Sequence, residues 1–145
     1  MSKESDSAVE YFNNGFNCAQ AVLFSHSAKF GLDEQTALKI SCAFGGGISY
    51  SNKTCGAVTG AIMLISLKYG KSSMEDNDAK DITFSLTRKF MQMFSEKHGS
   101  VNCTDLIGCD LSSEQKLLQA RETGVFKTVC PILVKDAVEI VEKLI

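Results

Sequence analysis

Several features that would assign this chain to a familiar class are scarce or absent. Among 145 residues there is no tryptophan, one proline (Pro131) and two histidines. The 15 basic and 17 acidic residues give a formal net charge of −2, and no cluster of Lys or Arg stands out. Such a cluster is the usual electrostatic signature of proteins that bind nucleic acid or anionic membranes. We therefore expect no nucleic-acid partner.

The sequence also lacks a long apolar run. Its longest, residues 57–67, is interrupted by Thr59, Gly60 and Ser66, and a membrane span needs about 20 apolar residues. We therefore interpret this run as a buried core helix and expect no membrane partner. The first ten residues, MSKESDSAVE, are polar and lack the apolar centre of a secretory signal. A cytoplasmic location is the resulting expectation.

The spacing of apolar residues is helical over much of the sequence. Hydrophobic residues make up 44% of the chain, enough for a core without disulfides. No alternating strand pattern persists beyond a few residues, and no low-complexity linker divides the chain. We predict an all-α fold, a single-domain irregular helical bundle of about six to eight helices that covers residues 1–145.

Capping residues and apolar spacing locate the helices. Asn17 and Gln20 have capping-box spacing, and Asp33 and Thr54 are further N-cap candidates. The predicted segments are roughly 5–15, 18–30, 34–44, 55–69 and 78–97, a short turn from 103, 112–124, and a last helix from Pro131. The apolar stripe of the long helix comprises Ile82, Leu86, Phe90, Met93 and Phe94.

Four of the six cysteines fall at or within one residue of a predicted helix start. These four are Cys18, Cys55, Cys103 and Cys130. The free N–H groups and the dipole at a helix start favour an anion, and they lower the pKa of a cysteine there. The sequence therefore predicts reactive thiolates at these positions. Cys42 is predicted to be a core residue. Cys109 lies in a loop, either as a resolving thiol for Cys103 or as a plain loop residue.

The cysteine spacing excludes several familiar sites. There is no C-x-x-C, so neither a thioredoxin-type motif nor a zinc ribbon is present, and there is no ferredoxin-like run. Consecutive members of the set of four lie between 27 and 48 positions apart. A shared site therefore has to be assembled by the fold.

Glycines accompany these cysteines. Gly56 and Gly60 lie four residues apart on one helix face, where small residues allow close approach of another helix or of a cofactor. We favour helix packing. Gly45, Gly46 and Gly47 can adopt left-handed backbone conformations or present backbone without side chains. A phosphate-binding loop requires G-K-S/T after such glycines, and this sequence lacks it. A cofactor-binding role would involve Gly56, Gly60, Gly46 and Gly47.

The same residues carry a family resemblance. The segments FNCAQAVL (16–23), FGGGI (44–48), CGAVTGA (55–61) and CTDLIG (103–108), followed by Cys130, are similar to the C_GCAxxG_C_C family of small proteins named as redox-active. The likeness covers nearly the whole chain. Its cysteine pattern corresponds to Cys18, Cys55, Cys103 and Cys130. The resemblance implies a redox or metal-binding role without naming a substrate.

Three functional hypotheses follow. The first is a thiol redox protein, a candidate thiol oxidoreductase, with Cys55 as nucleophile and Cys18, Cys103 or Cys130 as its partner. Its redox partner, a protein or a small oxidant or reductant, is not specified by the sequence. The second is a four-cysteine site for an iron–sulfur cluster or zinc. The third is a helical interaction module with inert buried cysteines. We take a homodimer as the working assumption.

Overall fold

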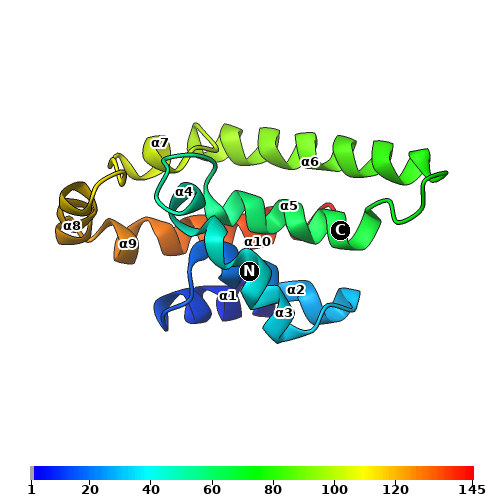
Figure 1. Ribbon diagram of the computed structural model, residues 1–145, viewed down its shortest axis with the longest axis horizontal. Helices are drawn as coiled ribbons and strands as arrows, with labels where there is room; N and C mark the ends of the chain where they lie inside the picture. The colour runs from blue at the N-terminus through cyan, green and yellow to red at the C-terminus, as the bar shows by residue number, and fades with distance from the viewer. Residues whose placement is uncertain (1) are drawn as a thin grey trace.

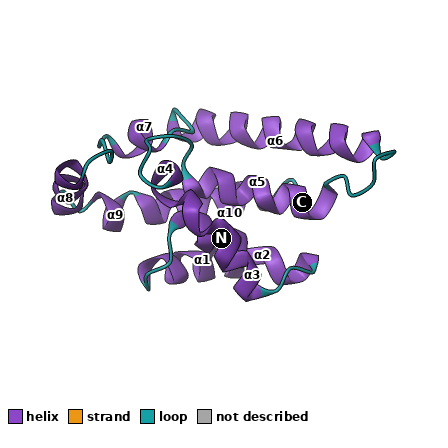
Figure 2. Cartoon of the chain, in the orientation of Figure 1, coloured by secondary structure: helices purple, strands orange, loops and turns teal. Residues whose placement is uncertain are grey.

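The fold is all-α, as the sequence predicts. The computed structural model describes residues 2–145, and in this range it contains helices and no strand (Figures 1 and 2). The helices are α1 (Lys3–Asn13), α2 (Cys18–Ser27), α3 (Glu34–Ser41), α4 (Gly45–Ile48), α5 (Gly56–Tyr69), α6 (Asn77–His98), α7 (Cys103–Ile107), α8 (Glu114–Glu122), α9 (Val125–Thr128) and α10 (Cys130–Glu142). None of the helices described is long and apolar enough to cross a membrane.

The helices form layers around α5 and α10. Figure 1 shows α6 along one side, α5 and α10 in the middle, and α1, α2 and α3 on the other side. The apolar run 57–67 lies within α5 and is largely buried, as predicted. A Cβ on Gly60 would lie 2.8 Å from the carbonyl oxygen of Ala19. The glycine therefore lets α5 approach α2 closely, which confirms the helix-packing interpretation.

Local capping chemistry explains where the helices begin. The Asn17 side chain accepts the N–H of Gln20, and the Gln20 side chain accepts the N–H of Asn17, which is the predicted capping box. Asp33 caps α3, also as predicted. Helix α1 begins earlier than predicted, because Ser2 and Ser5 form a capping box of their own. Helix α10 begins at Cys130, one residue before the predicted Pro131.

Two core predictions are wrong. Cys42 is exposed, because α3 ends at Ser41 and a 3-10 turn over Cys42–Phe44 redirects the chain. Ser41 takes the buried position instead, with its hydroxyl donating to the carbonyl of Ala37 at 2.7 Å. Ile82 is 49% exposed, whereas Phe90, on the same predicted stripe, is fully buried. Figure 1 shows the first turns of α6 extending past the ends of the central helices.

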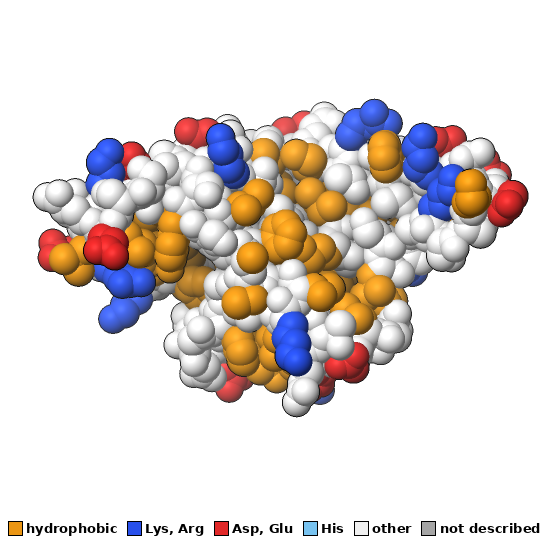
Figure 3. Space-filling model, in the orientation of Figure 1, with side chains coloured by type: hydrophobic (Ala, Val, Ile, Leu, Met, Phe, Trp, Pro, Cys, Tyr) orange, Lys and Arg blue, Asp and Glu red, His pale blue; other side chains and the backbone are white. Residues whose placement is uncertain are grey.

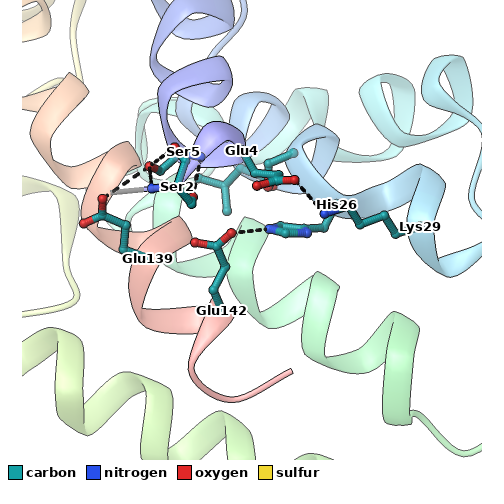
Figure 4. Close-up of polar contacts among 9 residues, drawn as sticks. Ser2, Glu4, Ser5, His26, Lys29, Glu139 and Glu142 are labelled. Atoms are coloured by element: carbon teal, nitrogen blue, oxygen red, sulfur yellow. Dashed lines mark hydrogen bonds and ion pairs between the residues drawn. The ribbon is translucent and has the colours of Figure 1, made fainter.

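A polar cluster connects α1, α2 and α10 (Figure 4). The buried His26 of α2 has its Nε2 3.0 Å from Oε2 of Glu142, near the end of α10. The Ser5 hydroxyl of α1 donates to Glu139 at 3.3 Å. Polar groups buried in this way need partners, because an unpaired one costs free energy. The cluster therefore fixes α2, which begins with Cys18, against α10, which begins with Cys130.

Candidate functional site

The four cysteines selected from the sequence line one cavity. It has a volume of about 630 Å³, and Cys18, Cys55, Cys103 and Cys130 all contribute to its wall. Each of them lies at the start of a helix or is its N-cap, in α2, α5, α7 and α10 respectively. The fold thus brings together thiols that are far apart in the sequence. Cys42 is not part of this wall, and Cys109 borders a separate, smaller pocket.

The rest of the wall is aromatic and cationic. Aromatic side chains come from Phe12, Phe16, Tyr50 and Phe126, and positive charge comes from Arg121 and Lys127. No Asp or Glu is among the lining residues. In Figure 3, hydrophobic side chains line a hollow between the α8–α9 end of the molecule and the α1–α2 end, with Lys or Arg at its edge. The cavity is therefore apolar with a positive border.

Cys18 is the thiol with the strongest support for its anionic form. It follows the N-cap Asn17 and is half-buried. Its sulfur accepts hydrogen bonds from the thiol of Cys55 and from the backbone N–H groups of Gly46 and Ala19. These donors stabilise the thiolate and lower the pKa of Cys18 to about 7, against the opposing effect of burial. A substantial fraction of Cys18 is therefore ionised at neutral pH.

Cys55 is positioned by a short backbone pairing. Its N–H donates to the carbonyl of Val101 at 2.8 Å, and the N–H of Cys103 donates to the carbonyl of Lys53 at 2.8 Å. The residues between, Thr54 and Asn102, form an isolated antiparallel bridge. This pairing places Cys55 beside Cys103. Cys55, and not the predicted Thr54, is the N-cap of α5.

The remaining thiols are held protonated. The pKa of Cys55 is raised well above its ordinary value, because its hydrogen is donated to Cys18 and its side chain is buried. Burial, followed by repulsion from the Cys18 thiolate, raises the pKa of Cys103 and of Cys130 to about 12 each. The prediction that a helix start lowers the pKa of all four cysteines is therefore correct for Cys18 and wrong for the other three.

An unusual backbone segment supplies the Gly46 donor. Gly46 and Gly47 both have φ of +68°, and the following Ile48, Ser49 and Tyr50 have φ between +54° and +64°. Consecutive left-handed residues are costly for side chains with a Cβ. Hydrogen bonds within the segment offset part of this cost, among them one from the Ser49 hydroxyl to the carbonyl of Ala43 at 2.8 Å. Strain of this kind concentrates at functional sites.

The four glycines assigned to a cofactor occupy different environments. Gly46 lines the cavity. Gly56 lies against the sulfur of Cys18, and a Cβ on Gly47 would meet that of Cys103 at 2.6 Å. Gly60 packs on α2, away from the cavity wall. Three of the four therefore contact the cavity or its cysteines, and Gly60 does not.

The four cysteines of the cavity wall are also the candidate metal ligands. Within residues 2–145, no three His, Cys, Asp or Glu side chains are grouped as ligands of one metal ion. A four-thiolate site would therefore need the cysteine side chains of the cavity wall to move closer together. Thiolates are nevertheless the preferred ligands of zinc and iron–sulfur clusters.

Several lining residues were not predicted from the sequence. Asn17 appeared there only as a helix cap, and Tyr50, Arg121 and Lys127 had no assigned role. The run of three glycines was the one visible signal for the left-handed segment. Nothing in the spacing of Arg121 and Lys127 indicates that they line the same cavity as Cys18, since that depends on how α8 and α9 are placed relative to the start of α2.

Fold and site together define a class: a helical protein in which four helix-start cysteines surround one cavity. The sequence model of the family described as "Putative redox-active protein (C_GCAxxG_C_C)" matches residues 16–144. The chain belongs to this family. No curated protein and no solved structure matches it.

Proposed function

We propose that the protein carries out thiol–disulfide redox chemistry with Cys18 and Cys55 as the reacting pair. The observation that carries this proposal is the proximity of the two cysteines: the sulfur of Cys18 lies against Gly56, the residue after Cys55, and hydrogen bonding between the two thiols lowers the pKa of Cys18 and raises that of Cys55. A protonated thiol beside a thiolate on the wall of one cavity supports the proposal. Low-pKa, accessible cysteines next to a second thiol are typical of redox-active sites.

The reaction proceeds in two exchange steps. The Cys18 thiolate attacks one sulfur of a substrate disulfide, which forms a mixed disulfide and releases the other sulfur with its electron pair as a thiolate. Cys55 then gives its proton to water or to the departing thiolate. Its sulfur attacks that of Cys18, forms the Cys18–Cys55 disulfide and releases the second substrate thiolate. Two protein thiols are oxidised, and one substrate disulfide is reduced to two thiols.

The assignment of nucleophile differs from the sequence-based choice of Cys55. Cys18 is the more accessible of the two, and its pKa lies near 7, where an attacking thiol works best at neutral pH. Cys55 is buried and protonated in the resting state. Once Cys18 is in a mixed disulfide, it no longer carries a negative charge. The pKa of Cys55 then falls, so the second thiol becomes reactive only after the first step.

Cys103 and Cys130 complete the set of thiols on the cavity wall. Both are buried, and their pKa values of about 12 keep them protonated at neutral pH. They therefore do not compete with Cys18 for a disulfide that enters the cavity. We assign them to the site as further thiols that become reactive only if their environment changes.

A second candidate function is a four-cysteine metal site. The observation that favours it is that all four thiols line the same cavity. Cys18, Cys55, Cys103 and Cys130 would be the ligands of a zinc ion or an iron–sulfur cluster, which would serve as a structural or electron-transfer centre. Protein purified without oxygen should then contain stoichiometric zinc or iron, and a cluster would colour it brown. A colourless, metal-free preparation would leave the dithiol proposal.

Thiol counting tests the dithiol proposal. The number of free thiols in the reduced protein should fall from six to four on equilibration with a small disulfide. Two-electron reduction should reverse this step. Cys18→Ser and Cys55→Ser should each abolish this intramolecular step. Cys42→Ala is the matched control, because Cys42 is exposed and outside the cavity wall, and its loss should leave the two-thiol step intact. If all thiols persist, the cysteines are inert and the helical-module hypothesis is preferred.

A further inference from the structure

We propose that the disulfide accepted by this site is a small anionic molecule, whose negatively charged groups bind Arg121 and Lys127. This inference rests on the dithiol function proposed above and adds the substrate class. Sites for small molecules usually have volumes of about 300–1,000 Å³. The cavity, at about 630 Å³, lies within that range. Its volume therefore suits a compound of low molecular weight that binds in the cavity between the helices.

The charges around the cavity select the sign of the ligand. Arg121 is in the last turn of α8 and Lys127 is in α9, and Gly124, with φ of +77°, turns the chain between them. Neither cation forms an ion pair within the described part of the chain. No carboxylate lines the cavity, so no acidic side chain of its wall competes with a ligand for these two cations. Arginine and lysine are the side chains that bind carboxylates and other anions.

This charge matters because the nucleophile is itself negative. A thiolate in a neutral environment repels an anionic disulfide and attracts a cationic one. Two cations that line the same cavity as the Cys18 thiolate oppose that preference and concentrate anions at the cavity. The native protein should therefore react faster with anionic than with cationic disulfides, which is the reverse of the order expected for a free thiol. The aromatic side chains of Phe16, Tyr50 and Phe126 provide contacts for the uncharged part of the molecule.

The test compares three symmetric disulfides of similar length: dithiodipropionate, which is dianionic, hydroxyethyl disulfide, which is neutral, and cystamine, which is dicationic. The rate of thiol loss from reduced protein is measured with each at pH 7 and low ionic strength, where charge effects are least screened. Each rate is divided by that of a small model thiol with the same disulfide. We expect the normalised rate for the dianion to exceed that for the dication at least tenfold.

Charge-removing variants assign the effect to the two residues. Arg121→Gln with Lys127→Gln should lower the rate for the dianion about tenfold and leave the neutral disulfide nearly unchanged. Arg121→Lys, which keeps the charge, should retain most of the preference. Lys89→Gln is the matched control, since it removes an exposed cation of α6 that does not line the cavity. Loss of the preference in this control would overturn the assignment.

The outcomes separate this inference from the function on which it rests. Equal normalised rates, or a faster reaction with the dication, would overturn the substrate class while the Cys18–Cys55 disulfide still forms. A double variant that slows all three disulfides equally would also overturn it, because the two residues would then act on structure and not on charge. If no probe produces an intramolecular disulfide, the dithiol function itself fails.

Discussion

The sulfur of Cys18 lies against the backbone of Gly56: a Cβ at that position would overlap with Sγ, closer than real contacts allow. Gly56 is the first residue of α5, and Cys55 precedes it. Because Gly56 has no side chain, the sulfur of Cys18 at the start of α2 can lie directly against the backbone at the start of α5. The proximity of Cys18 and Cys55 depends on this approach, so Gly56 should matter for the proposed redox pair as well as the two cysteines.

Gly56→Ala should displace the Cys18 sulfur. The added methyl would meet this sulfur and also lie 3.0 Å from the backbone nitrogen of Ala19. Overpacking of this kind costs about 1–3 kcal/mol of unfolding free energy, measurable by urea denaturation. The pKa of Cys18 should rise, because the sulfur moves away from its donors. The pH dependence of Cys18 alkylation measures that change.

Gly60→Ala is the matched comparison for that variant. Its Cβ would meet Ala19 and Val22 of α2 and would not touch the sulfur. It should lower the unfolding free energy by a similar amount and shift the alkylation midpoint of Cys18 less. If Gly56→Ala and the unmodified protein have the same midpoint, the contact between Gly56 and Cys18 does not govern the thiolate.

The Cys55 thiol should control the ionisation of Cys18. In the intact protein the alkylation rate of Cys18 should follow a pKa of about 7. Cys55→Ala removes the largest stabilising donor, so the midpoint should move up toward the ordinary cysteine value of about 8.5. Mass spectrometry of alkylated peptides resolves Cys18 from the exposed Cys42. A midpoint that stays near its original value in Cys55→Ala would assign the lowered pKa to the backbone donors alone.

Stability should change with pH in two opposite phases. Between pH 7 and about 8.5 the unfolded chain holds the Cys18 proton and the folded protein does not, so the unfolding free energy rises with pH, by on the order of 1–2 kcal/mol. Above about pH 8.5 the unfolded chain loses protons that folded Cys103 and Cys130 retain up to about pH 12. Stability should therefore fall there.

Paired variants separate the two phases. Cys103→Ala with Cys130→Ala should reduce the alkaline fall, and Cys18→Ala should reduce the rise below it. Denaturation midpoints measured across the pH range give both slopes. A fall above pH 8.5 that persists unchanged in the Cys103 and Cys130 double variant would have to come from other groups.

The helix boundaries show how much the sequence determines. The capping box at Asn17 and the cap at Asp33 are local, and both were predicted correctly. Because caps are local, the four helix-start cysteines could also be named from the sequence, and they line one cavity. The exposure of Cys42 could not be predicted, because it depends on a 3-10 turn that ends α3 early.

The pKa values of the four cavity cysteines could not be predicted from the sequence, for a physical reason. A helix start favours an anion by a limited amount, whereas burial opposes it strongly. Which effect prevails depends on the number of donors that reach each sulfur. Cys18 receives the Cys55 thiol and the Gly46 N–H, whereas Cys130 is dominated by burial. These two donors come from segments far along the chain, unlike the N–H of Ala19, so capping rules applied to residues 17–20 could not identify them.

The contact between His26 and Glu142 should matter for stability and not for redox chemistry. His26→Ala would leave the largely buried Glu142 carboxylate without this partner, which should cost about 2–3 kcal/mol of unfolding free energy. Lys29→Gln breaks an exposed pair with Glu4 and should leave the unfolding free energy nearly unchanged. Thermal denaturation measures both. The alkylation midpoint of Cys18 should be the same in each, and a shift in His26→Ala would show that this cluster also positions the thiolate.

Disulfide mapping tests the central claim most directly. The six cysteines fall in five tryptic peptides, with Cys18 in residues 4–29, Cys55 in 54–68 and Cys42 in 40–53. The reduced protein is oxidised with a small disulfide, residual thiols are blocked, and the digest is analysed without reduction. The account predicts a linked pair of peptides 4–29 and 54–68, at the same yield in Cys42→Ala. A dominant link to any other peptide, or no link, would contradict the assignment of Cys18 and Cys55 as the redox pair.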